Sequence, residues 1–193
     1  MHRDLTPAES LKVIENMIQQ AKQSFHRMSF YFLLWGGLLT LATLFDFAMS
    51  LAGHAYGWLG WPVIGVLGGV LSLNYGARET KRQGGETMMD RVLQWIWFGF
   101  IITMVIMNVC AVAAQQNPGP TVTILTGLPT FVTGAIMRFK PLLIGGVLFW
   151  CIGAISFFVP GTMGALLFAV AMFVGYIVPG LMLKRQENVV RTA

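Results

Sequence analysis

The sequence predicts an all-α integral membrane protein with six transmembrane helices, arranged as three hairpins and preceded by an N-terminal cytoplasmic amphipathic helix. Composition gives the first indication: 55% of the 193 residues are hydrophobic and only 11% are charged, against about a quarter in soluble domains. The hydrophobic residues also fall in blocks long enough to cross a bilayer. Finally, the basic residues lie in the terminal segments and at the ends of these blocks, and none lies in the middle of a block. We therefore expect one membrane domain.

Residues 1–28 are polar and carry one apolar stripe. The stripe repeats at steps of three and four residues, as on one face of a helix, and consists of Leu11, Ile14, Ile18, Ala21 and Phe25. An interfacial helix lying on lipid headgroups would have this pattern, and so would a helix packed beneath the bundle or a dimerisation helix. No proline or glycine interrupts the chain between Ala8 and Trp35. The helix is therefore expected to continue into the first apolar block.

Six apolar blocks follow, separated by short polar or Pro/Gly-rich segments. The predicted spans are residues 29–51, 57–77, 92–114, 122–139, 141–159 and 162–183, and a cytoplasmic tail comprises residues 184–193. Thr87 and Asp90 resemble a helix cap before the third span. Pro179 and Gly180 are expected to bend the sixth span.

The distribution of charge predicts the topology. If six spans alternate, all 13 lysines and arginines lie on one side of the membrane, and the loops around His54, Asn117 and Gly161 carry none. The positive-inside rule then places both termini in the cytoplasm, and we expect the plasma (inner) membrane of a bacterium. Because the basic residues flank apolar blocks and do not line one face, the net charge of +5 does not indicate nucleic acid binding.

Gly65 and Gly69 in the second span are spaced as a GxxxG pair. Such pairs let another helix approach closely. The partner helix would belong either to the same chain or to a second copy, which would make the protein a homodimer.

Asp46 is the first candidate site residue, because it is the one formally charged residue in the interior of an apolar block, away from its last two residues. An ionisable side chain in hydrocarbon is costly and usually faces the bundle interior or a water-filled cavity. Asn108 and Thr126 are expected at a similar depth, and His54 at the rim. These four residues predict a cation or proton site that opens outward. The alternative is that Asp46 only forms a hydrogen bond near the end of its helix.

The fourth span is the second candidate. It contains Gly127 and Pro129, which are expected to break the helix and free backbone carbonyl groups. Its polar side chains are the threonines Thr123, Thr126, Thr130 and Thr133. Interrupted spans line the binding sites of several transporter folds, although ordinary kinked helices have the same composition.

No enzyme motif is present. The histidines, His2, His26 and His54, are far apart, so no metal site is predicted, and no nucleotide or cofactor fingerprint appears. The cysteines Cys110 and Cys151 are interpreted as small buried hydrophobic residues. We therefore expect no enzymatic activity and no cofactor.

Two functions stay open. The first is a small transporter or channel-like protein with a polar site near the outer face, formed by Asp46, Asn108, Thr126 and His54. The alternative is a non-transporting membrane regulator or scaffold. It would act on a cytoplasmic protein partner through the N-terminal helix and the 78–91 loop.

Overall fold

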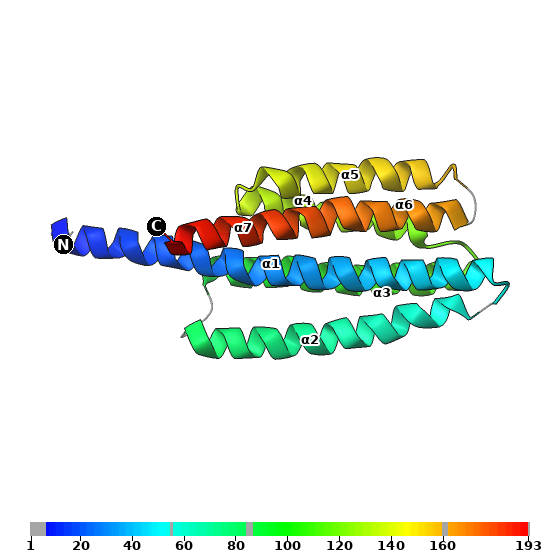
Figure 1. The fold of residues 1–193 in the computed structure, drawn as a ribbon, viewed down its shortest axis with the longest axis horizontal. Coiled ribbons are helices and arrows are strands. Elements are labelled where there is room, and N and C mark those ends of the chain that lie inside the picture. The colour runs from blue at the N-terminus through cyan, green and yellow to red at the C-terminus, as the bar shows by residue number, and fades with distance from the viewer. Residues whose placement is uncertain (1–6, 55, 84–86, 160–161, 193) are drawn as a thin grey trace.

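The computed structural model describes residues 7–54, 56–83, 87–159 and 162–192, and the described part of the chain is helical. Residues 1–6 of the predicted N-terminal segment and residue 193 of the tail lie outside it. Long helices run side by side along one axis (Figure 1). The elements are α1 (Pro7–Leu51), η1 (Gly57–Leu59), α2 (Gly60–Gln83), α3 (Met88–Ala113), α4 (Gly119–Ile136), α5 (Lys140–Ser156), α6 (Thr162–Met172), the π-helix η2 (Phe173–Ile177) and α7 (Val178–Thr192).

Five helical segments are long and apolar enough to cross a membrane. They are Arg27–Leu51, Gly57–Arg82, Met88–Ala113, Gly119–Ile136 and Met163–Arg185. A further helix, Lys140–Ser156, is apolar but shorter. The prediction of a helical membrane protein is therefore confirmed. The sixth span and the arrangement in hairpins stay predictions.

Helix α1 is a single helix of 45 residues. At 1.5 Å per residue it is roughly 68 Å long, about twice the thickness of the hydrocarbon core of a bilayer. Its N-terminal part extends past the ends of the other helices (Figure 1). An unbroken helix that enters the membrane cannot also lie flat on the surface, so this geometry argues against the interfacial alternative for residues 7–28.

Helix α1 also forms the centre of the bundle, in contact with α2, α6, η2 and α7. Its buried Phe32 packs edge-on against Trp97 of α3 and Tyr176 of η2. Tyr176 in turn meets Phe149 of α5 edge-on. Such aromatic contacts join four elements around one apolar core.

Helices α4 and α5 form the closest pair, because glycines seven residues apart line both. Gly127 and Gly134 lie on α4, and Gly146 and Gly153 lie on α5. A β-carbon added at Gly146 would come within 2.8 Å of the Cα atom of Phe131. Glycine at these positions lets the two backbones approach, and a larger side chain would force them apart.

The last transmembrane segment departs from α-helical geometry about one turn before Pro179 and Gly180, where the sequence predicted a bend. The π-helix Phe173–Ile177 precedes Pro179, which lies within α7. Proline has no N–H to donate to the carbonyl of residue i−4, here Gly175. Gly175 lies within the π-helix. The ring of Phe149 packs against Gly175.

Helix α2 meets α1 through small residues at four-residue spacing, namely Gly68, Ser72 and Gly76. The ring of Trp35 lies over Gly68, and its Nε1 donates to the Oγ of Ser72 at 3.1 Å. The hydroxyl of Tyr31 lies beside Gly76. This face of α2 holds the helix against α1.

The predicted GxxxG pair, Gly65 and Gly69, lies to one side of that interface. A β-carbon added at either glycine would meet no atom of the described chain within 4 Å. The close helix contact inside the chain therefore uses other small residues. A contact of this pair with a second copy stays a prediction.

Candidate functional site

Asp46 lies five residues before the end of α1 and is half-buried. Its Oδ2 accepts a hydrogen bond from Nε1 of Trp61 at 3.4 Å. Gly57 of η1 packs directly on Asp46, so that a β-carbon there would overlap the carboxylate. Asp46 therefore helps to seat η1 and the start of α2 against the far end of α1.

The other predicted site residues bond within their own segments. Asn108 donates from Nδ2 to the carbonyl of Met104 at 2.8 Å. His54 is exposed. In the described part of the chain, no hydrogen bond or ion pair joins any two of Asp46, His54, Asn108 and Thr126.

An open cavity of about 430 Å³ lies beside Asn108 and is otherwise lined by Val109, Val112 and Ala113. All four lining residues belong to α3, and three of them are apolar. The amide oxygen of Asn108 is the one side-chain oxygen among these lining residues, whereas a cation site needs several oxygen ligands.

Helix α4 continues through Gly127 and Pro129 as one helix from Gly119 to Ile136, so neither residue ends it. Gly127 instead lies against the indole ring of Trp150. The four threonines donate to the carbonyl four residues earlier in α4, as threonine commonly does inside helices. The acceptors are Gly119, Val122, Thr126 and Pro129.

Two of these threonines also bind aromatic side chains. Nε1 of Trp97 donates to Oγ1 of Thr133 at 3.2 Å, and the hydroxyl of Tyr176 is hydrogen-bonded to Thr130. Thr130 and Thr133 are completely buried. The polar residues of α4 thus connect α3, α4 and η2, and the hydroxyl of each threonine has a hydrogen-bond partner.

A charged site that the sequence did not predict lies at the other end of the bundle, where α1 emerges. Arg27 and Asp90 form an ion pair at 2.8 Å between Nη2 and Oδ2, and they are 4% and 3% exposed. The pair joins α1 to the first turn of α3. Because 63 residues separate the two in the chain, no local pattern marks their contact.

The capping box of α3 holds Asp90 in place. The same Oδ2 accepts from the backbone N–H of Thr87 at 3.0 Å and from its hydroxyl at 2.6 Å. The N–H of Asp90 donates back to Oγ1 of Thr87 at 3.1 Å. The cap predicted from Thr87 and Asp90 is therefore confirmed. The carboxylate of Asp90 both completes this cap and forms the ion pair with Arg27.

Glu79 of α2 and Tyr31 of α1 complete this site, which we call the Arg27 cluster (Arg27, Tyr31, Glu79, Thr87 and Asp90). Glu79 is 8% exposed, and Tyr31 lies within electrostatic range of Arg27, Asp90 and Glu79. Nε of Arg27 is buried without a hydrogen-bond partner among the described residues. Charged residues from α1, α2 and α3 thus converge where α1 leaves the bundle.

Within the described residues, no group of three or more His, Cys, Asp or Glu side chains could hold a metal ion. Cys110 and Cys151 are exposed, so the expectation that they are buried is wrong. Both lie on apolar helices, where lipid can cover them. Comparison with family models, with curated proteins and with solved structures finds no match to this chain.

Proposed function

We propose that this protein is a membrane regulator or scaffold that binds a cytoplasmic protein through the N-terminal part of α1. In this proposal six spans cross the inner membrane and both termini are cytoplasmic. The observation that supports this proposal most directly is the continuity of α1 from Pro7 to Leu51. A partner bound to its projecting part would hold the same rigid element that forms the centre of the bundle.

The projecting part carries an apolar stripe in its sequence. Leu11 is 67% exposed, and the stripe continues through Ile14, Ile18 and Phe25 in the sequence. Helix-in-groove recognition uses apolar anchors at this spacing. Full burial of each such side chain stabilises a complex by roughly 1.5–3 kcal/mol before ordering costs, so three or four anchors suffice for a specific contact.

The Arg27 cluster supports coupling between this contact and the bundle. It ties α1 to α3 at the level where α1 leaves the bundle, through a buried ion pair. A buried pair favours one register of the two helices, because any sliding leaves a charge unpaired in a poorly solvated site. Force applied to residues 7–26 would therefore act on α3 as well as on α1.

Transport is the second candidate, and one observation favours it. Asp46 is a half-buried carboxylate whose described side-chain hydrogen bond, to Trp61, is long at 3.4 Å. A carboxylate held so weakly is available to a cation at the outer rim. The regulator is preferred because no described hydrogen bond or ion pair joins Asp46 to Asn108 or Thr126.

Site-specific photo-crosslinking in cells tests the proposal. A photoreactive residue placed at Leu11 or Ile18, on the stripe, should give one discrete adduct with another protein. The same residue at Lys12 or Gln19, on the polar face of the same helix, should give little. Deleting residues 1–24 should remove the partner from purified complexes, whereas Asp46→Asn should not.

Equal adducts from both faces, or no loss of partner on deletion, would reject the regulator. The transporter has its own test in reconstituted vesicles. Proton or cation flux that depends on the protein and disappears with Asp46→Asn would establish transport in its place.

A further inference from the structure

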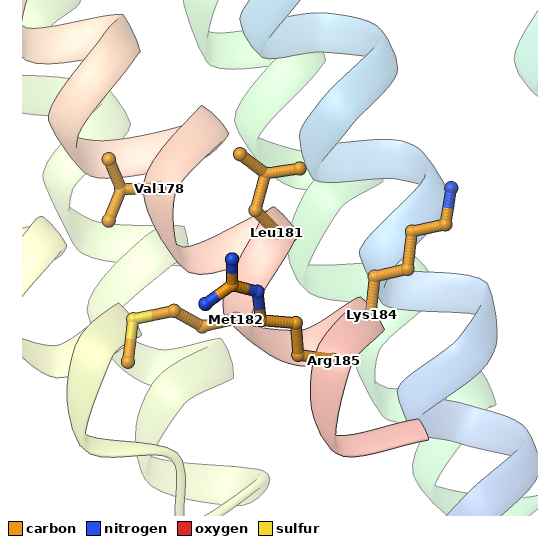
Figure 2. A pocket seen from close by; sticks show the side chains of 5 residues that line it. All are labelled: Val178, Leu181, Met182, Lys184 and Arg185. Carbon is orange, nitrogen blue, oxygen red and sulfur yellow. The ribbon is translucent and has the colours of Figure 1, made fainter. Parts of the chain in front are cut away.

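Helix α7 has two faces, and only the inner one is used by the bundle. Pro179 and Leu183 are buried, and Gly180 lies against Leu33 of α1. The outer face carries an open cavity of about 350 Å³ (Figure 2), lined by Val178, Leu181, Met182, Lys184 and Arg185. This cavity is separate from the Arg27 cluster and from the projecting part of α1.

The lining changes from apolar to basic along the helix. Val178 and Arg185 are seven residues apart, which is roughly 10 Å of helix. Arg185 also ends the apolar segment Met163–Arg185, so in the proposed topology it lies at the level of the headgroups. Figure 2 shows its guanidinium turned back toward Leu181 and Met182, while the amine of Lys184 points away.

No described carboxylate competes for these cations at the surface. At this end of the bundle, every exposed charged side chain that the structure describes is basic. The set comprises Arg78, Lys81, Arg82, Arg91, Arg138, Lys140, Lys184 and Arg185. The described acids at this end, Glu79 and Asp90, are buried. Clustered basic residues beside a membrane span attract anionic lipid headgroups.

We propose that this cavity binds an anionic phospholipid. Arg185 holds the phosphate, and an acyl chain lies over Leu181, Met182 and Val178. The amine of Lys184 points away and contributes only to the positive potential around the site. Guanidinium groups bind phosphate through two parallel hydrogen bonds. Three of the five lining residues are apolar, which favours a lipid over free phosphate. All five lining residues belong to α7, so the site is an open surface along which a headgroup and the start of an acyl chain can lie.

Lipid titration of the purified full-length protein tests this site. The protein in neutral detergent is titrated with phosphatidylglycerol or phosphatidylcholine, and bound lipid is counted by native mass spectrometry. A basic residue next to a bound anionic headgroup contributes about a fivefold change in affinity. Arg185→Gln should therefore weaken phosphatidylglycerol binding about fivefold. The Lys184→Gln/Arg185→Gln double variant should weaken it further, by at most about 25-fold.

Three further arms separate this site from other sources of binding. Arg78→Gln removes an exposed charge at the same end but outside the cavity, so it should retain the wild-type affinity. Leu181→Trp fills the cavity without changing charge and should weaken binding at least as much as Arg185→Gln. Glycerol phosphate, which has the same charged group without acyl chains, should not compete.

Equal losses for Arg78→Gln and Arg185→Gln would show a diffuse electrostatic attraction and would overturn the proposal. Equal binding of the two lipids, or competition by glycerol phosphate, would do the same. If Leu181→Trp fails to fold, the two charge variants and the competition still decide, because Lys184 and Arg185 are exposed.

Discussion

The ion pair between Arg27 and Asp90 gives the sharpest energetic prediction. Both side chains are almost completely buried, and removing one member of a buried pair typically costs 3–5 kcal/mol. In Arg27→Met, the two hydrogen bonds from Thr87 to the carboxylate persist. The loss in the free energy of unfolding should therefore be about 3 kcal/mol.

Asp90→Ala should cost more than Arg27→Met. It leaves a buried guanidinium without this partner, and it also removes the capping box of α3, worth about 1 kcal/mol. The expected loss is about 5 kcal/mol. The double variant Arg27→Met/Asp90→Ala removes both members of the pair and leaves Glu79 as the remaining charged member of the Arg27 cluster. It should lose less than the sum of the single variants, by about 2–3 kcal/mol.

Unfolding by SDS in mixed micelles, followed by far-UV circular dichroism, measures these differences. Arg78→Met is the control, because an exposed cation at the same end should change stability by less than about 0.5 kcal/mol. Additive single variants would refute the reasoning, since they would mean that the pair is not coupled. A larger loss for Arg27→Met than for Asp90→Ala would refute the role of the cap.

Three further variants test the packing and the polar groups within the membrane. Gly146→Ala should destabilise the protein by roughly 1–3 kcal/mol in SDS unfolding, because its β-carbon meets the backbone of α4. The control Gly99→Ala, at a position with open space around it, should be neutral or slightly stabilising. Equal effects of the two variants on stability would count against close α4–α5 packing. Thr133→Val should cost about 1 kcal/mol, because the indole N–H of Trp97 loses its acceptor; an unchanged indole exchange rate by NMR would contradict this contact. Asp46→Asn should leave the free energy of unfolding within about 1 kcal/mol of wild type, since an amide oxygen can still accept from Trp61; a loss above about 3 kcal/mol would assign the carboxylate charge a structural role.

Local signals in the sequence predicted local structure well. The uninterrupted stretch between Ala8 and Trp35 predicted that the polar N-terminal helix continues into the membrane, and α1 does so. The spacing of Thr87 and Asp90 predicted the capping box of α3. Both depend on backbone requirements within a few residues, which the chain specifies directly.

Contacts between distant segments were not predictable in the same way. Arg27 and Asp90 each look like ordinary charges flanking an apolar block, and only the packing of α1 beside α3 makes them a pair. The GxxxG pair Gly65 and Gly69 shows the same limit. A small-residue pattern marks a helix face that allows close approach, but the partner of that face is set by the whole bundle.

Polar residues in the membrane raise a further ambiguity. The threonines of α4 suggested a site because unpaired polar groups are costly in hydrocarbon. Their hydroxyls instead bond to the preceding turn of the same helix. Composition cannot distinguish these two arrangements, since both satisfy the same donors.

The proposed function depends on α1 being one rigid helix on both sides of the membrane boundary. Spin labels at the exposed residues Leu11 and Leu44, in protein reconstituted into nanodiscs, test this directly through a pulsed electron–electron distance. The positions are 33 residues apart, so a continuous helix predicts a narrow distribution near about 50 Å. A helix that bends at Met28 to lie along the surface would give about 35 Å. That shorter distance would contradict the account.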